Sequence, residues 1–367
     1  MINRLTILCI GFAATPAIAQ EIHDTFGSTQ ADVTLEMMDA AEALLATLDN
    51  PARASREEML DIRTDHLQLS MEDENRQDWS YWPRSQHGLL LSLMTTEQRI
   101  LTHELLDTLL SVKGQLKTTQ IMELDNILED TEFVGQPRGF ENYYLSIFGV
   151  PSAEAPWAWR FQGHHLSLNV TLAGGNIMVT PSFLGATPAE IPTGFMAGVR
   201  TLRAEEDLGR ALVRSLDESQ REKTIISAQA PRDIFAGNLN AHEFRLKPRQ
   251  DWDLWRETLQ PQGIAVAGLS ESQRTYVRRI VDEVITTYRP EISNAYLQSI
   301  DIEDLHFAWM GSTERRSPHY YRLQGSDFVF EFENFQGDGN HIHTVWRSEA
   351  GDFGADLLAS HHREAHQ

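Results

Sequence analysis

Residues 163–181 read GHHLSLNVTLAGGNIMVTP and predict a β-hairpin. Residues 164–172 carry the alternating, partly β-branched pattern of a strand, Gly174 and Gly175 supply a two-residue turn, and residues 176–181 form the returning strand. Two strands joined by so short a turn must run antiparallel. This stretch therefore favours an antiparallel sheet as the centre of the fold.

A second stretch, DGNHIHTVWR at residues 338–347, predicts another strand and contains two histidines two residues apart. Side chains alternate between the two faces of a strand, so His341 and His343 point the same way. Two imidazoles on one face can share a metal ion, and neutral imidazole suits zinc, copper, iron or nickel. The alternative is a pair of structural histidines that hydrogen-bond to backbone or carboxylate groups.

The chain contains an internal similarity. Residues 88–99 (GLLLSLMTTEQR) align without gaps with residues 263–274 (GIAVAGLSESQR), and both contain the capping-box pattern that opens a helix. WRFQG at 159–163 aligns with YRLQG at 321–325. GNIMVT at 175–180 aligns with GNHIHT at 339–344. Each unit thus contains helices, an R-x-Q-G motif and a hairpin.

These matches predict an α+β fold with two related helix-plus-β-hairpin halves, arising by internal duplication, around a mostly antiparallel sheet. The histidines are not equivalent in the two halves, because His165 aligns with Asp327 and His343 aligns with Val179. If the halves pack about a pseudo-twofold axis, the two hairpins lie side by side. Their histidines would then form one composite site.

The first residues have the features of a secretory signal: Arg4, an apolar stretch at 5–14, and the Ala17-Ile18-Ala19 cleavage motif. An uncleaved anchor is the alternative; no later stretch is apolar enough to span a membrane. We expect cleavage after Ala19 and a periplasmic or secreted product. The expected organisation is a signal peptide at 1–19, an N-terminal helical segment at 20–87, a first half at 88–200, a helical connection at 201–262 and a second half at 263–367, with 20–367 as one compact domain.

Composition excludes some classes of function. The only cysteine, Cys9, lies in the predicted signal, so the mature chain has no disulfides, thiolate nucleophile or cysteine ligands. The formal net charge of −22 disfavours nucleic acid and anionic membrane surfaces as partners. The simplest interpretation of the excess of acidic residues is that it keeps the protein soluble.

Helical periodicity predicts further elements. Residues 29–49, 118–128, 202–227 and 270–288 fit helices, as do segments after Trp252, after Pro290 and near 355–362. The aromatic cluster at residues 78–83 (DWSYWP) could line a pocket. Core packing or a cover over the sheet is the favoured role.

The candidate metal ligands are His165, His341 and His343, with His164 less favoured because it shares a strand face with Leu166. Carboxylates near the second pair could contribute, and Glu333 is the candidate general base. Asn169 shares the face of His165, and Arg347 could hold an anionic substrate. Asp352 and Asp356 could support the imidazoles, and surface or capping roles are the alternative. The terminal histidines could bind metal adventitiously: His361, His362 and His366.

Several motifs together resemble a known family: GHHLSLN after W-x-W-R, YYLSIFGVP, HYYRLQG, and GNHIHTVWR followed by DFGADLL. The chain resembles, over nearly all of its mature length, the bacterial family catalogued as domain of unknown function 3500. The resemblance implies export but brings no settled activity or substrate. It marks as signature positions His164, His165, Asn169, His341, His343, Arg347 and Asp352, and it matches the acidic residue and asparagine at Glu333 and Asn334.

The leading hypothesis is an exported metal-dependent enzyme, a hydrolase in preference to a redox enzyme, that uses zinc, iron or copper and acts on a small or anionic substrate. The rival is a non-catalytic protein that binds metal or a small ligand. A third interpretation makes the histidines structural. The substrate, the metal and the oligomeric state are not determined by the sequence.

Overall fold

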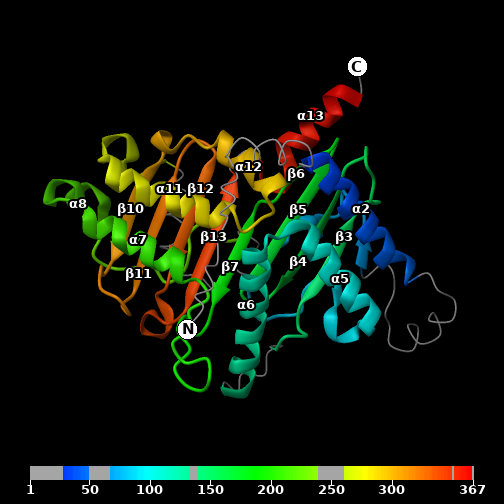
Figure 1. Ribbon diagram of the computed structural model, residues 1–367, viewed down its shortest axis with the longest axis horizontal. Coiled ribbons are helices and arrows are strands. Elements are labelled where there is room, and N and C mark those ends of the chain that lie inside the picture. The colour runs from blue at the N-terminus through cyan, green and yellow to red at the C-terminus, as the bar shows by residue number, and fades with distance from the viewer. Residues whose placement is uncertain (1–27, 49–66, 132–138, 239–259, 349–350, 366–367) are drawn as a thin grey trace, which may run out of the picture.

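The computed structural model describes residues 28–48, 67–131, 139–238, 260–348 and 351–365. These ranges contain eight α-helices packed on one large sheet (Figure 1). The helices are α2 (Gln30–Ala46), α5 (Thr96–Leu109), α6 (Val112–Thr131), α7 (Arg203–Ser215), α8 (Glu218–Thr224), α11 (Glu271–Ile285), α12 (Pro290–Ser299) and α13 (Ala355–Ala365). The predicted α+β class with a mostly antiparallel sheet is confirmed.

The sheet has 13 strands, whose main order is β1-β3-β4-β5-β7-β13-β12-β11-β10-β8, while β2, β6 and β9 pair with β3, β5 and β10. Among the strands of the described ranges, only β1 with β3 and β8 with β10 run parallel. The strands are β1 (Gln68–Leu69), β2 (Leu89–Leu90), β3 (Tyr144–Phe148), β4 (Trp157–Gly163), β5 (Leu166–Ala173), β6 (Asn176–Met178), β7 (Ser182–Ala186), β8 (Ile225–Ser227), β9 (Ile264–Ala265), β10 (His306–Gly311), β11 (His319–Gln324), β12 (Phe328–Glu333) and β13 (Ile342–Ser348).

The two faces of the sheet have different covers. In Figure 1 the helices α6, α7 and α11 lie in front of the strands, and their apolar residues form one large core with alternate strand residues such as Leu166 and Leu168. Alternation turns Ser167 and Asn169 to the opposite face. There a smaller apolar cluster forms around Trp79, Tyr81, Phe183, Ile234, Ala236, Val329 and Val345. The aromatic segment at 78–83 therefore packs on the sheet, as favoured from its composition.

The predicted capping boxes open the helices. The Thr95 hydroxyl accepts from the Gln98 amide and the Gln98 side chain accepts from the Thr95 amide, which satisfies two free donors at the start of α5. Ser270 and Gln273 make the same pair of bonds at α11. The first helix, predicted at 29–49, is α2, which is capped by Thr29.

Two boundaries differ from prediction. The helix expected at 202–227 is divided into α7, α8 and β8, because Asp217 forms a new capping box with Gln220. The strand expected from residue 164 begins at Leu166. His164 and His165 form the turn between β4 and β5 instead, and His165 has φ 63°. The segment after Trp252 and the signal region lie outside the described residues.

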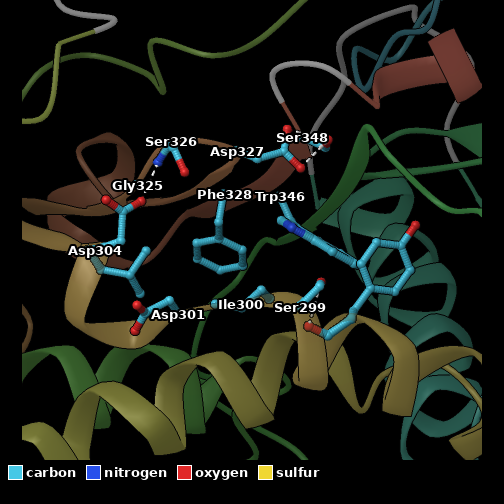
Figure 2. A pocket seen from close by; sticks show the side chains of 12 residues that line it. Ser299, Ile300, Asp301, Asp304, Gly325, Ser326, Asp327, Phe328, Trp346 and Ser348 are labelled. Carbon is cyan, nitrogen blue, oxygen red and sulfur yellow. Dashed lines mark hydrogen bonds between the residues drawn. The ribbon is translucent and has the colours of Figure 1, made fainter. Parts of the chain in front are cut away.

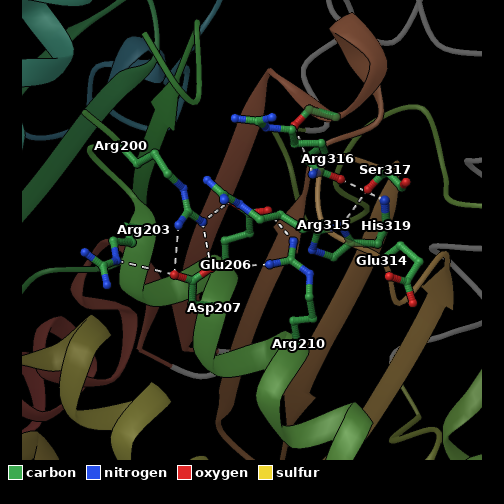
Figure 3. A network of polar contacts seen from close by, with 12 residues as sticks. Arg200, Arg203, Glu206, Asp207, Arg210, Glu314, Arg315, Arg316, Ser317 and His319 are labelled. Carbon is green, nitrogen blue, oxygen red and sulfur yellow. Dashed lines mark hydrogen bonds and ion pairs between the residues drawn. The ribbon is translucent and has the colours of Figure 1, made fainter. Parts of the chain in front are cut away.

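An ion-pair network ties the start of α7 to neighbouring loops (Figure 3). Arg200 bonds to Glu206 and, at 2.8 Å, to Asp207, while Arg210 bonds to Glu206 as well. His319 lies beside this network, stacked on Trp309 at 4.8 Å between ring centroids. Burial lowers the pKa of His319 to about 4. The hydrogen bond to the Ser317 carbonyl and the charge of Glu206 raise this pKa, but by less. This imidazole is therefore neutral at physiological pH.

Within the described ranges, no helix combines the length and apolar content needed to cross a bilayer.

Candidate metal centre

The sheet register brings the two histidine stretches together. β7 lies between β5 and β13, with Leu184 opposite Leu166 on one side and Gly185 opposite His343 on the other. The Gly185 amide donates to the His165 carbonyl at 2.7 Å, which fixes the β4–β5 turn beside β13. A Cβ atom at Gly185 would lie 2.9 Å from Cδ2 of His165, so glycine at this position leaves room for the imidazole.

Three imidazoles meet at this point. The Nε2 atom of His341 lies 2.8 Å from Nε2 of His165 and 3.0 Å from Nε2 of His343. One nitrogen from each of the three rings lies within 4.8 Å of the others. Two nitrogens bound to one zinc ion at 2.0–2.1 Å lie about 3.3 Å apart in a tetrahedral site. The two separations from His341, 2.8 and 3.0 Å, are therefore within about 0.5 Å of the spacing in a zinc site.

Access to the cluster is from one side. His165 and His343 are buried, each 3% exposed, whereas His341 is half-buried. The Tyr81 ring stacks on Phe183 at 4.0 Å and meets the edge of His343 at 5.2 Å. The Tyr81 carbonyl also accepts the His165 amide. The aromatic segment therefore covers one side of the cluster, and His341 faces the more open side.

Asp233 orients His343 from its other nitrogen. Its Oδ1 lies 2.8 Å from Nδ1 of His343, and its Oδ2 accepts the Tyr81 hydroxyl at 3.0 Å. Glu333 lies next to it, 3.5 Å from the same Nδ1. Metal-binding histidines usually donate their second N–H to a carboxylate in this way, which fixes the tautomer and leaves the other nitrogen free for the metal.

The electrostatics follow from this burial. For His343, burial is the largest influence and lowers the pKa, but Asp233 and Glu333 together outweigh it and raise the pKa to about 9. Burial raises the pKa of Glu333 to about 7, partly opposed by His343. A second group of convergent ligand atoms, from Asp233, Glu333 and His343, uses this side of the ring. The contact of Nδ1 with Asp233 favours the three-histidine side as the metal position.

The predicted residues do not all join the cluster. The His164 ring stacks on His165, with 3.8 Å between the ring centroids, but it offers no nitrogen to the cluster. Its Nδ1 lies 2.5 Å from Asp125 of α6 instead, and its carbonyl accepts the buried Tyr143 hydroxyl. It is a buried histidine with a carboxylate partner and is not in the group of convergent ligand atoms, because residues 164 and 165 form a turn rather than a strand. Glu333 faces Nδ1 of His343 rather than the convergent Nε2 atoms, a position that suits orientation of the ring better than proton transfer at the cluster.

Asn169 and Arg347 make contacts away from the three histidines. Asn169 donates to the Pro181 carbonyl at 2.8 Å. Arg347 bonds to Asp352 at 2.6 Å and to the Ala236 carbonyl at 3.0 Å. Arg347 thereby holds the segment that follows Asp233. His361 and His362 lie on α13, and His366 lies outside the described residues.

Asp233 and Asp125 were missed from the sequence. Neither lies in a motif: Asp233 follows a proline-containing segment, PRD at 231–233, and Asp125 lies on a helix of mixed composition. Both lie far along the chain from their histidine partners. Only the tertiary contact identifies them.

Comparisons with known proteins agree with the resemblance of the motifs. Searches of curated proteins and of solved structures found no match. The family model described as "Protein of unknown function (DUF3500)" matches residues 30–355, a range that includes all three clustered histidines, Asp233 and Glu333. The chain therefore belongs to the DUF3500 family.

Proposed function

We propose that this protein is a metal-dependent enzyme whose metal ion is held by His165, His341 and His343. The observation that carries the proposal is the convergence of three imidazoles, one from the β4–β5 turn and two from residues 341–343, with one nitrogen of each ring within 4.8 Å of the others. A structural role for the histidines would need no such convergence. Three neighbouring imidazoles without a shared metal or proton would also repel if charged.

The ligand number favours catalysis over a structural metal. Structural zinc sites use four protein ligands, whereas catalytic sites keep a position for water or substrate beside three. A metal ion in this site would lower the pKa of bound water and polarise a substrate oxygen. The chain's own part is to fix the imidazoles: Asp233 and Glu333 orient His343, and Gly185 makes room for His165.

A hydrolytic reaction is preferred to redox chemistry. The imidazoles suit zinc, iron or copper. Hydrolysis is preferred because the mature sequence offers no cysteine or methionine ligand motif that would favour copper. Arg347 is already bonded to Asp352 and to backbone carbonyls, so it has fewer N–H donors left for an anionic substrate. Export to the periplasm or beyond remains part of the proposal, on the basis of the N-terminal signal pattern.

We infer that the composite site arose by internal duplication. In support, the central strands follow one another in the order β3-β4-β5-β7 and then β13-β12-β11-β10. Each strand of the first half thus corresponds to a strand of the second half at the same distance from the β7–β13 pair. The pair Arg160 and Asn169 between β4 and β5 corresponds to the pair Arg322 and Glu331 between β11 and β12, at the offset of 162 residues found in the sequence. The two halves then meet where β7 pairs with β13, which is where the histidines gather.

The test is elemental analysis of the protein exported without an affinity tag, with His361, His362 and His366 replaced by glutamine to remove adventitious binding. We expect about one equivalent of a single transition metal. The double variant His341→Ala/His343→Ala should lose it. Metal retained by that variant would exclude the site.

The matched control is His319→Gln, which removes another buried histidine of the sheet without touching the cluster. It should retain full metal occupancy. If both the double variant and the control lose metal, the effect reports unfolding, which thermal denaturation would reveal.

The rival function is a non-catalytic metal-binding protein. It predicts the same stoichiometry and the same loss in the double variant, but no turnover. Screening the metal-loaded protein with ester, amide and phosphoester substrates separates the two. Hydrolysis that disappears with the metal and in His341→Ala supports the enzyme.

A further inference from the structure

A cavity of about 360 Å³ lies far along the sheet from the histidines' turn, between the end of α12 and the turn that joins β11 to β12 (Figure 2). Ser299 and Ile300 line one side, and the 3₁₀ segment η4 (Ile302–Asp304) continues it. Gly325 and Ser326 line the opposite side. Its volume is at the lower end of the range of small-molecule pockets.

The floor of the cavity is aromatic. Trp346 and Phe328 project into it from β13 and β12 (Figure 2), and Tyr296 of α12 completes the lining. The Tyr296 and Trp346 rings meet nearly at right angles, with centroids 4.9 Å apart, and Phe328 lies 6.3 Å from Trp346. Aromatic faces of this kind attract cations, tryptophan most strongly.

Three carboxylates border this floor: Asp301, Asp304 and Asp327. Among the described residues, no lysine, arginine or histidine lines the cavity. Each is held in place by a donor of the chain. Asp301 accepts the Glu303 amide at 2.9 Å, Asp304 accepts the Ser326 amide at 2.7 Å, and Asp327 accepts the Ser348 hydroxyl at 2.8 Å. The hydrogen bond from the Ser326 amide lowers the pKa of Asp304, so this carboxylate is ionised at neutral pH.

These carboxylates do not form a metal site. Among the described residues, the groups whose ligand atoms converge are the two that contain His343, and none of the three aspartates belongs to either. A bare divalent cation needs several oxygens at one point. Separate carboxylates around an aromatic floor suit an organic cation instead.

Trp346 supplies an independent indication of a ligand. The side chain is buried, with the residue only 3% exposed, yet no described residue accepts a hydrogen bond from its indole N–H. Figure 2 shows the indole nitrogen on the edge of the ring that faces Phe328, inside the cavity. The nitrogen itself is open to the cavity, so an oxygen atom that enters the cavity can accept from it. The missing acceptor would be an oxygen of the ligand.

We propose that this cavity binds a small hydroxylated organic cation, of the size and chemistry of choline or ethanolamine. The ammonium group lies over the aromatic floor among the carboxylates, and the hydroxyl oxygen accepts from Trp346. This site is separate from the metal centre. Its occupancy does not depend on the function proposed for the histidines.

Isothermal titration calorimetry of the full chain with choline chloride and with ethanolamine tests the proposal. We expect binding of at least one of them with a Kd below about 1 mM, which corresponds to about −4 kcal/mol. The neutral isostere of choline, 3,3-dimethylbutan-1-ol, should bind at least tenfold more weakly because it lacks the charge. No heat from either cation, or equal binding of the neutral alcohol, would overturn the proposal.

Two variants assign the binding to this cavity. Asp301→Asn/Asp304→Asn keeps both carbonyl acceptors for the backbone amides but removes two charges, and it should weaken binding at least tenfold. Asp282→Asn, on the exposed side of α11, removes a charge elsewhere and should leave the Kd unchanged. Unchanged affinity in the double variant, with a normal melting temperature, would exclude the cavity.

A third variant separates this site from the metal centre. His341→Ala/His343→Ala should bind the cation as the wild type does. Failure of the metal proposal therefore leaves the cation proposal testable, and the reverse also holds.

Discussion

Replacing Asp233 tests whether the carboxylate behind His343 supports metal binding. In Asp233→Asn the amide oxygen can still accept from Nδ1 of His343 and from the Ile234 amide, which both contact Oδ1 now. The amide nitrogen would face the Tyr81 hydroxyl, which can accept instead of donate. The substitution therefore removes the charge and keeps most of the hydrogen bonds.

The expected magnitude follows from what each variant removes. Loss of a carboxylate that supports a metal-bound histidine lowers metal affinity by about 10- to 100-fold, or about 1.4 to 2.7 kcal/mol. Asp233→Asn should lie near the lower limit, because the hydrogen bond to His343 is kept. Asp233→Ala removes both charge and bond and should lie near the upper limit. Tyr81→Phe leaves the charge in place and should change the affinity less than threefold.

The assay is competition for Zn²⁺ between the protein and a chelating dye at fixed pH and ionic strength, with the terminal histidines replaced. The order of affinity should be wild type, Tyr81→Phe, Asp233→Asn and Asp233→Ala. Wild-type affinity in Asp233→Ala, in a folded protein, would refute the role of this carboxylate. The assignment of the three histidines would then rest on their own variants.

Three further outcomes concern stability. The pKa of His319 is about 4 in the folded protein and about 6.5 when unfolded, so the unfolded chain binds the extra proton and stability is lost as pH falls from about 6.5 to 4. The loss should approach 3 kcal/mol in urea denaturation, and it should be absent in His319→Phe; an unchanged slope would contradict a buried neutral imidazole. Lys117 bonds to two carboxylates at 2.6 Å each, so Lys117→Met should lower the free energy of unfolding by about 3–5 kcal/mol, while Arg278→Met, at an exposed ion pair, should cost less than about 1 kcal/mol. Asp125→Asn should destabilise by about 1–3 kcal/mol but keep full metal content, since its partner His164 stacks on His165 without offering a ligand nitrogen; loss of metal would show that the β4–β5 turn depends on this pair.

Local patterns were sufficient for much of the fold. The capping boxes at Thr95 and Ser270 identify helix starts from four consecutive residues, because the hydrogen bonds that they predict are themselves local. The alternation after residue 165 and the Gly174-Gly175 turn predict β5 and β6 for the same reason. The error in the predicted start of β5 also concerns local backbone conformation. The turn at His164 and His165 was assigned to a strand, because a positive φ at a histidine has no signal in the residue pattern.

The candidate site was partly accessible to sequence reasoning. His341 and His343 follow from strand periodicity, and the alignment of the halves suggested that His165 would join them. The orientation of the carboxylates around His343 could not be predicted from the sequence. Glu333 was expected at the reacting side of the cluster but faces the opposite nitrogen of His343, and this depends on the register between β12 and β13.

The sequence by itself determined the family, the α+β class, the helix starts and the two histidines on either side of Ile342, the first residue of β13. These properties depend on residues close together along the chain. Only the tertiary structure decided that His165 meets His341, that His164 turns to Asp125 instead, and that Asp233 supports His343. The physical reason is that these contacts join residues 39 to 176 positions apart. Contacts between residues so far apart along the chain depend on strand order and register, which are determined by packing of the whole sheet.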